Sequence, residues 1–273
     1  MADMEEKVRA HYNAEGLIDR IKGALAATGS GDAKVTPDQL AGFDQFHTRG
    51  LPATLALAEA TRLVTGELVL DLGCGLGGPA RVLADRFGVS VVGIDLSAPF
   101  IEAGDYLTGR CGLEDVVSLA VGDATNPQVA DASFDAVFLQ HVAMNIADRA
   151  GLYAAIHRVL KPGGRFASYD VVRGEGDLHF PVPWSREPET SHLLNPAETV
   201  AAIAAAGFEI DLDRDDTGTV MEWFAQVTAA GGPPPGPSLA LVIGADFPLV
   251  TGNLARNLRE GRAGIRTIVA RKS

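Results

Sequence analysis

The sequence has 273 residues, a net charge of −12 and an apolar fraction of 47%. This length and apolar content suffice for one large α/β domain with elaborations, whereas the negative charge argues against broad binding of a nucleic-acid backbone, which needs clustered cations. Two cysteines, Cys74 and Cys111, form neither a disulfide framework nor a zinc-ligand pattern, which favours a reducing, cytoplasmic compartment.

The first part of the chain, 1–66, is predicted to be a helical N-terminal lid. Leu17, Ile21 and Leu25 recur at helical spacing, and Thr36 followed by a proline is typical of a helix start. The stretch lacks the apolar core of a signal peptide, and no window reaches the roughly 18 apolar residues of a membrane span. We therefore expect a soluble protein.

From Gly66 onward, short apolar runs alternate with helical segments, which is the pattern of parallel strands joined by crossover helices. We expect an α/β domain over 67–273. The predicted strands are 68–73, 90–95, 116–121, 135–141, 164–171, 208–213 and 265–271. The predicted helices are 77–87, 98–110, 148–160 and 196–206.

Two insertions interrupt this alternation. The segment 172–195 contains HFPVPWSREP, which is too rich in proline for a helix interior, and 218–262 places two helices around GGPPPGP. Because both follow strands, we expect them above the carboxyl edge of the sheet, where open α/β folds bind ligands.

The stretch VLDLGCGLGGPARVLA, residues 69–84, has glycines at 73, 75 and 78, the spacing of a dinucleotide-binding loop. Such glycines allow a tight turn and let a ligand approach the backbone amides at a helix start. Asp95 ends the second strand, where its carboxylate can accept from both ribose hydroxyls of an adenosine. This combination fits NAD and adenosyl ligands equally.

Two further carboxylates bear on the choice of ligand. Asp123, in VGDAT after the third strand, can accept from an adenine amine, with the amide of Ala124 completing the base edge. Asp71 precedes the glycine loop and would repel a pyrophosphate but attract an ammonium or sulfonium. A ring of acids therefore favours a cationic ligand.

The motifs VLDLGCGLGGPARVLA, VVGIDLS, VGDAT, ADASFDAVFLQHV and IHRVLKPGGRFASYD together resemble the class I S-adenosylmethionine-dependent methyltransferases over 67–213. The form GLGGPAR is similar to the small-molecule branch with sarcosine and dimethylglycine, sterol, tocopherol and quinone methyltransferases. The resemblance implies a Rossmann-like, seven-stranded, mostly parallel sheet with an antiparallel last strand. It also implies S-adenosyl-L-methionine as cofactor and S-adenosyl-L-homocysteine as product.

The resemblance carries binding roles onto matching positions. It implies that Gly73 and Gly75 contact the methionyl part of the cofactor, and that Asp95 and Leu96 contact the ribose. It implies that Asp123 and Ala124 contact the adenine. Gln140 would contact the amino-acid end, and Asp71 would lie near the ammonium. For the cofactor's carboxylate we expect Arg49, in FHTRG, because its planar guanidinium suits a carboxylate. An ordinary surface arginine is the alternative.

His141 is the candidate general base. It lies at the carboxyl end of the fourth predicted strand, and an imidazole can take a proton from a hydroxyl, thiol or ammonium. A sulfonium already activates its methyl group, so we expect an in-line displacement at a site shielded from water, without a metal. A histidine that only hydrogen-bonds the cofactor or a loop is the alternative.

Substrate contacts are predicted from the loops around this edge. Asn145 can orient a polar group of the substrate, whereas Met144 is expected to pack. Further candidates share a place in the insertions, beside a strand end or in the N-terminal lid: Asp170, His179, Trp184, Trp223 and Tyr12.

The predicted function is methyl transfer to N, O or C of a small-molecule metabolite. An NAD-dependent oxidoreductase and a catalytically silent S-adenosylmethionine-binding module are the alternatives. We expect no nucleic-acid or membrane partner, and the apolar second insertion is a candidate homodimer surface.

Overall fold

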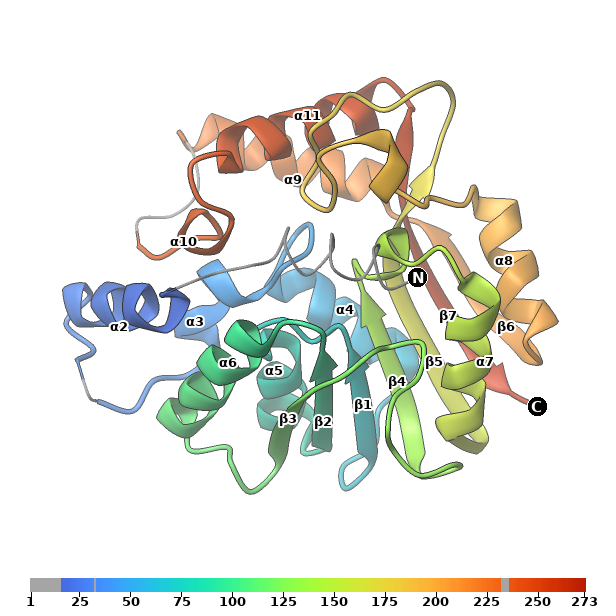
Figure 1. The fold of residues 1–273 in the computed structure, drawn as a ribbon, viewed down its shortest axis with the longest axis horizontal. Coiled ribbons are helices and arrows are strands. Elements are labelled where there is room, and N and C mark those ends of the chain that lie inside the picture. Colours follow the sequence, from blue (N-terminus) through green and yellow to red (C-terminus); the bar gives the residue numbers. More distant parts are fainter. Residues whose placement is uncertain (1–15, 32, 232–235) are drawn as a thin grey trace.

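The structure, a computed structural model, describes residues 16–31, 33–231 and 236–273. Its strands within these ranges form one sheet in the order β3-β2-β1-β4-β5-β7-β6 (Figure 1). Their bounds are β1 Leu68–Leu72, β2 Ser90–Asp95, β3 Val117–Val121, β4 Phe134–Gln140, β5 Leu160–Arg173, β6 Phe208–Asp215 and β7 Ala263–Lys272. Strand β7 runs antiparallel to both of its neighbours, and β1 to β5 pair in parallel. The predicted fold class is confirmed.

The helices connect and cover these strands. Their bounds are α2 Leu17–Ala27, α3 Pro37–Asp44, α4 Leu51–Thr61, α5 Gly78–Phe87, α6 Ala98–Cys111, α7 Arg149–Val159, α8 Pro196–Ala205, α9 Thr217–Ala229, α10 Ala240–Ile243 and α11 Phe247–Arg259, with short 3₁₀ helices η1 Ala143–Asn145 and η2 Pro188–Thr190. Within the described ranges, no helix combines the length and hydropathy that a membrane span requires.

The central strand β4 shows why the sheet is buried on both faces. Its sequence FDAVFLQ sends Ala136 and Phe138 into the cluster with α4 and α5, and Val137 and Leu139 into the cluster with α7 and α8. A parallel strand covered on both sides reads as a continuous apolar run rather than an alternating one.

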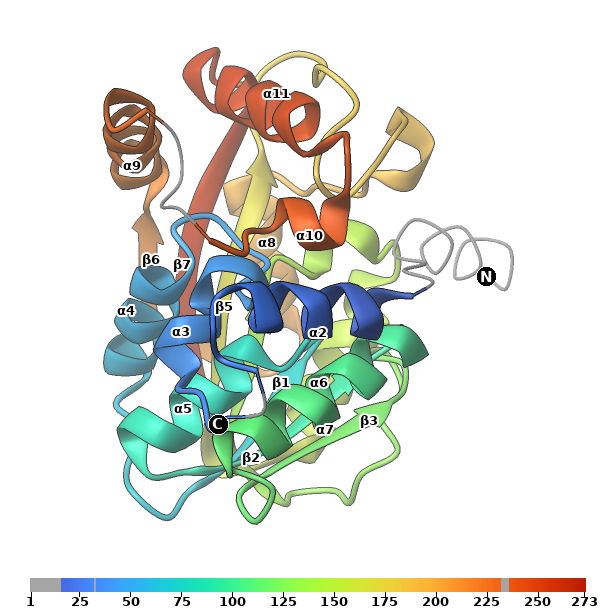
Figure 2. The same cartoon turned by 90° about the vertical axis from the view of Figure 1, so that its left-hand side faces the viewer.

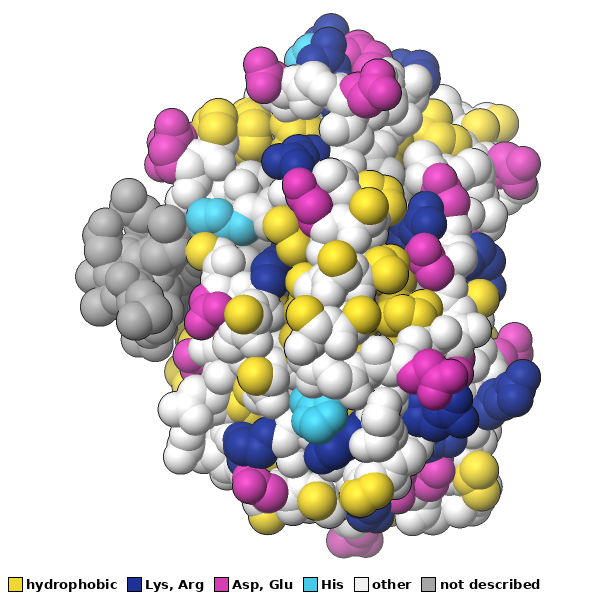
Figure 3. Space-filling model, turned by 90° about the vertical axis from the view of Figure 1, so that its right-hand side faces the viewer, with side chains coloured by type: hydrophobic (Ala, Val, Ile, Leu, Met, Phe, Trp, Pro, Cys, Tyr) yellow, Lys and Arg dark blue, Asp and Glu magenta, His cyan; other side chains and the backbone are white. Residues whose placement is uncertain are grey.

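Figure 3 shows the face at the right of Figure 1, where acidic and basic side chains are interspersed among hydrophobic ones.

The predicted and observed elements differ at a few places. Strand β5 begins at Leu160 rather than 164, because Leu160 pairs with Phe134 across a register shift and KPGG forms an irregular start of the strand. The second insertion contains α9, the short α10 and α11 instead of two helices. Both insertions lie over the carboxyl edge of the parallel strands, as expected (Figure 1). The division of the chain at residue 66 stays a prediction.

The N-terminal helices are fixed to the glycine-loop region by a buried ion pair. In Figure 2, α2 and α3 lie over α6 and α5. Arg81 of α5 donates to Asp44 Oδ2 at the end of α3 at 2.9 Å, and both side chains are at most 1% exposed. The same guanidinium donates to the carbonyl of Gly104 and the hydroxyl of Thr108 at 3.1 Å. A Cβ on Gly78 would lie 2.1 Å from the carbonyl oxygen of Asp44, so glycine permits this close approach.

Replacing Asp44 with alanine should lower the free energy of unfolding by about 3–5 kcal/mol, because it leaves the Arg81 charge buried and unpaired. Urea denaturation measures this loss. Asp38→Ala is the matched control, since Asp38 and Arg86 join the same two helices through an exposed pair, for which we expect less than about 1 kcal/mol. Equal losses in the two variants would contradict the role given to the buried pair.

Candidate functional site

A cavity of about 270 Å³ opens at the carboxyl ends of β1 to β4. Its lining comes from the loops after these strands, from the N-terminal segment and from the first insertion. The lining residues are Phe46, Gly73, Gly75, Ile94, Asp95, Leu96, Ser97, Phe100, Gly122, Asp123, Ala124, Thr125, Gln140, His141, Val142, Met144, Asn145, Ile146, Ala147, Asp148, Pro183 and Trp184. The cavity therefore lies where an open α/β sheet binds its ligand.

The glycine loop closes tightly under this cavity. Gly73 has a φ of 72°, and a Cβ there would lie 2.3 Å from the side chain of Val142 in the loop after β4. The amides of Gly73 and Cys74 both donate to the carbonyl of Ile94, at 2.7 and 3.1 Å. Glycine at 73 thus lets the loops after β1 and β4 meet.

Asp95 holds two backbone amides with its carboxylate. Its Oδ2 accepts from the amide of Gly75 and its Oδ1 from that of Ser97, each at 2.9 Å. Burial nevertheless raises the pKa of Asp95 above its ordinary value, and the two amides oppose that rise. Asp95 and Leu96 both line the cavity, as the sequence predicted for a ribose site.

Asp71 lies beneath the loop at the end of β1 and does not line the cavity itself. It is 1% exposed, and its Oδ2 has no hydrogen-bond partner among the described residues. Burial, and secondarily the charge of Asp95, raises its pKa to about 7. An ammonium or a bridging water reaching this oxygen would supply the missing partner.

The residues predicted to contact adenine lie together on the cavity wall after β3. Both oxygens of Asp123 are engaged by Thr125, from its amide at 2.8 Å and its hydroxyl at 2.7 Å. Asp123 therefore stabilises the turn after β3, but it also lines the cavity beside Ala124. A carboxylate has further lone pairs, so the two roles are compatible.

Gln140 ends β4 and lines the cavity. The hydroxyl of Thr54 donates to Gln45 Oε1 at 2.8 Å and lies 3.3 Å from Gln140 Oε1. The Nε2 atoms of both glutamines are buried without a partner in the described structure. Gln45 was not anticipated from the sequence.

Arg49 is not brought to this cavity. It has a φ of 64° and is half-buried, and its positive charge lies close enough to Tyr169 to lower the pKa of that hydroxyl. Burial outweighs this effect and raises the pKa of Tyr169 to about 12. The role of Arg49 as a carboxylate ligand stays a prediction without support from the lining.

His141 lines the cavity in a strained conformation. Its φ of 55° is uncommon for a residue other than glycine, and its amide donates to the carbonyl of Tyr169 at 2.9 Å. The ring stacks on Tyr169, and Nε2 lies 3.3 Å from the hydroxyl of Thr48, which lies 2.8 Å from the Tyr169 hydroxyl. Burial, and then the neighbouring His47, holds the pKa of His141 well below its ordinary value, so the imidazole is neutral at pH 7.

Thr48 and Tyr169 are site residues that sequence analysis missed. Thr48 stands next to Arg49 in the FHTRG stretch, and Tyr169 lies within the buried run of β5, but nothing in either stretch indicates that the two side chains meet. Because Nε2 of His141 faces Thr48, proton acceptance from the cavity requires Nδ1, with Nε2–H donating to Thr48.

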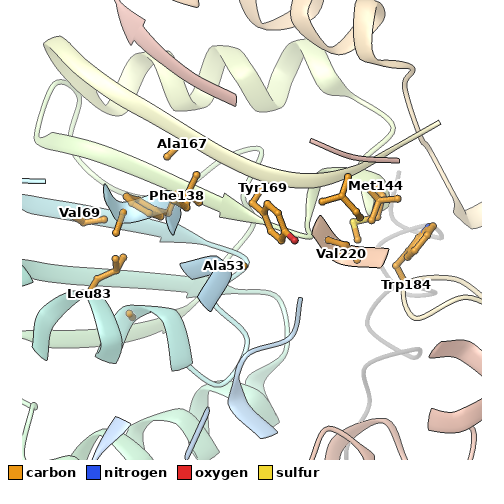
Figure 4. Packing of buried hydrophobic residues seen from close by; sticks show 14 of the residues in the cluster. Ala53, Val69, Leu83, Phe138, Met144, Ala167, Tyr169, Trp184 and Val220 are labelled. Atoms are coloured by element: carbon orange, nitrogen blue, oxygen red, sulfur yellow. The ribbon is translucent and has the colours of Figure 1, made fainter. Parts of the chain in front are cut away.

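The loop after β4 carries Asn145, one of the predicted substrate residues. Asn145 lines the cavity, and its Oδ1 is buried with no partner in the described part of the chain. Met144 also lines it and, together with Trp184, belongs to the buried cluster that extends from the sheet core (Figure 4). The indole of Trp184 donates to the hydroxyl of Ser191 at 3.0 Å.

Asp170 supports this loop rather than lining the cavity. Its Oδ2 accepts from the amides of Ala143 at 2.7 Å and Val142 at 3.3 Å, and its Oδ1 accepts from Val171 at 2.8 Å. Burial raises the pKa of Asp170 to about 6.

The structure does not bring His179 and Trp223 to the cavity. Nε2 of His179 lies 2.7 Å from Glu260 at the end of α11, and Trp223 packs against Phe224 on α9. Tyr12 lies outside the described residues. Within the ranges that the structure covers, no group of three or more His, Cys, Asp or Glu side chains is arranged to hold a metal ion.

The charged groups that the described residues contribute to the cavity are acidic. Asp95, Asp123 and Asp148 contribute carboxyl groups, and no lysine or arginine is among the described lining residues. With His141 neutral, a positively charged ligand is favoured over a phosphate.

Comparison with known proteins assigns the central part of the chain to a family. Residues 70–168 match the model of a methyltransferase domain. The chain therefore contains a methyltransferase domain, and the predicted resemblance is confirmed.

Two relatives illustrate this family. A sterol 24-C-methyltransferase from Eremothecium gossypii is 36% identical over 63% of this chain and 48% of its own length. Phosphoethanolamine N-methyltransferase 1 from Arabidopsis thaliana is 37% identical over 46% of this chain and 25% of its own. The matched stretch thus spans half or less of these curated relatives.

A solved structure supports the fold over the whole length. Geranyl diphosphate C-methyltransferase from Streptomyces coelicolor A3(2) aligns with a TM-score of 0.72 at 17% identity, covering 99% of this chain and 98% of the other. That protein was solved with Mg²⁺, geranyl-S-thiolodiphosphate and S-adenosyl-L-homocysteine.

Asp71→Asn should remove a pH dependence of stability. Because the pKa of Asp71 rises from its ordinary 3.8 to about 7 on folding, the folded chain retains a proton that the unfolded chain has lost, and stability falls between about pH 4 and pH 7. The loss is on the order of 4 kcal/mol at about 1.4 kcal/mol per pKa unit.

Urea denaturation at several pH values measures this effect. An asparagine side chain cannot ionise, so the Asp71→Asn variant should become more stable than the natural chain as pH rises to 8. Glu102→Gln, at an exposed position of α6, is the control and should follow the natural profile. Parallel profiles for Asp71→Asn and the natural chain would exclude a raised pKa.

Proposed function

We propose that this chain, which contains a methyltransferase domain, is an S-adenosyl-L-methionine-dependent enzyme that methylates N, O or C of a small-molecule metabolite. The observation that carries the proposal is the acidic cavity at the carboxyl edge of the sheet. Its described lining has carboxylates and no lysine or arginine, which suits a ligand with an ammonium and a sulfonium and disfavours the pyrophosphate of NAD.

The residues present fit this cofactor. Asp95 with Leu96 would hold the ribose, Asp123 with Ala124 the adenine, and the loop at Gly73 and Gly75 the methionyl part. Among the described residues, the buried Oδ2 of Asp71 lacks a partner, and so does the amide nitrogen of Gln140. An ammonium and a carboxylate would satisfy one each. When bound, the cofactor supplies an activated methyl group.

His141 is the proposed proton acceptor. Its neutral imidazole lines the cavity, and the hydroxyl of Thr48 at 3.3 Å together with the stacked ring of Tyr169 fixes its position. Such positioning keeps a proton acceptor at the wall that an acceptor substrate would approach. The apolar walls of the cavity exclude water.

The cellular setting is proposed on narrower grounds. Neither Cys74 nor Cys111 is in a disulfide, and both are buried, which supports a cytoplasmic location. The homodimer through the second insertion remains a proposal from composition.

Titration calorimetry distinguishes the cofactor classes. S-adenosyl-L-homocysteine should bind saturably, and NADH should bind at least roughly a hundredfold more weakly, since its phosphates meet only acids. Tight NADH binding without S-adenosyl-L-homocysteine binding would establish the oxidoreductase alternative.

Methyl transfer itself is tested with methyl-labelled S-adenosyl-L-methionine and a small-molecule metabolite extract. We expect label to enter a metabolite, and His141→Ala to lower the rate by roughly 10²–10⁴-fold with unchanged S-adenosyl-L-homocysteine affinity. His157→Ala, a histidine of α7 that packs on Phe208, is the matched control. Cofactor binding without any labelled product would instead indicate a silent binding module.

A further inference from the structure

We propose that the methyl acceptor is a phosphate-free, largely apolar molecule whose amine N–H groups donate to Asn145 and His141, or whose single hydroxyl donates to Asn145. This inference rests on the proposed function and adds a substrate class to it. It concerns the part of the cavity formed by the loop after β4 and by the first insertion.

The walls of this part are mainly apolar. Val142, Met144 and Ile146 come from the loop after β4, and Pro183 and Trp184 come from the first insertion. Met144 and Trp184 are 2% and 3% exposed and are continuous with the sheet core (Figure 4). A ligand filling this region gains free energy mainly from burial of its own apolar surface.

Two hydrogen-bond acceptors lie among these apolar walls, one on Asn145 and one on His141. The Oδ1 of Asn145 is buried without a partner in the described structure, a condition that costs free energy until a donor arrives. In the tautomer whose Nε2–H donates to Thr48, the neutral ring of His141 offers a second acceptor at Nδ1. A hydroxyl, which has one O–H, satisfies one of these atoms, and an amine with two N–H groups satisfies both, whereas a group with acceptor oxygens only satisfies neither.

The charges near these atoms oppose a phosphate. Asp148 is exposed at the rim, and Asp95 and Asp123 lie further along the same cavity. Arg149, the cation next in sequence, is 8% exposed, and its guanidinium donates to the carbonyls of Ile146 and His192 at 3.0 and 2.9 Å. Its charge also lowers the pKa of the buried Asp170, so it is already engaged within the loop.

This arrangement separates the chain from two of the proteins that it resembles. The phosphoethanolamine relative and the structural neighbour are named for phosphorylated substrates. A cavity whose described lining offers carboxylates and uncharged acceptors selects against such a substrate by repulsion and by unpaired acceptors.

The test uses geraniol, geranylamine and geranyl diphosphate, which share one hydrocarbon chain and differ in the head group. Each is titrated calorimetrically into the full chain saturated with S-adenosyl-L-homocysteine. Geraniol and geranylamine should bind at least roughly tenfold more tightly than geranyl diphosphate. Equal or tighter binding of the diphosphate overturns the proposal, and so does the absence of binding by both geraniol and geranylamine at millimolar concentration.

Asn145→Leu tests the head-group contact. It should weaken geraniol binding by roughly three- to tenfold and leave binding of the corresponding hydrocarbon without the hydroxyl unchanged or tighter. A purely structural role for Asn145 would weaken both ligands equally and would contradict the proposal. Asn145→Asp, which retains the acceptor oxygens, should preserve geraniol binding and strengthen geranylamine binding.

Binding of S-adenosyl-L-homocysteine is measured first in every variant. If the natural chain does not bind S-adenosyl-L-homocysteine, the proposed function is refuted. Retained cofactor binding with the reverse order of head groups would refute the substrate class alone.

Discussion

The buried carboxyl groups beneath the glycine loop constrain everything else at the site. Asp95 accepts from two backbone amides, whereas the Oδ2 of Asp71 has no partner in the part of the chain that the structure describes. Burial, and then the charge of Asp95, raises the pKa of Asp71 to about 7. Without a bound ligand, ionisation of both carboxyl groups is unfavourable, because burial and like charge both oppose it. A ligand that carries positive charge relieves both costs at once. The cationic cofactor of a methyltransferase is such a ligand.

Much of the surrounding structure serves to hold the cavity around these acids. The buried Arg81–Asp44 pair and the close approach at Gly78 fix the N-terminal helices beside the glycine loop. On the other side, Asp170 binds the amides that begin the loop after β4. That loop carries His141 and Asn145 to the cavity that Asp95 and Asp123 also line. The acceptor side thereby receives uncharged hydrogen-bond acceptors set in an apolar surface, which is the physical basis for selecting an uncharged or amine head group.

The sheet and the cofactor side could be predicted from the sequence better than the acceptor side. Strands buried on both faces, such as β4, read as unbroken apolar runs, and a glycine loop followed by strand-terminal acids has a fixed place at the sheet edge. His141 and Asn145 follow the end of a strand, and Trp184 lies in an insertion after a strand, so the sequence predicts all three at this edge. All three line the cavity. The Thr48 to Tyr169 contact joins residues 121 positions apart and depends on how the N-terminal segment folds back. Residue type and position along the chain suggested that Arg49, His179 and Trp223 lie near the cavity, but they do not specify where a side chain points. In the structure these side chains lie near Tyr169, Glu260 and Phe224 instead.

The linkage between cofactor binding and protonation tests the central claim most directly. Titration of S-adenosyl-L-methionine at pH 7 in buffers of different ionisation enthalpy measures the number of protons released on binding. With the pKa of Asp71 at about 7, a bound cation that lowers this pKa should release about half a proton, and Asp71→Asn should abolish the release. Binding without proton release, or a release that survives Asp71→Asn, would contradict the account of an acidic site completed by a cationic ligand.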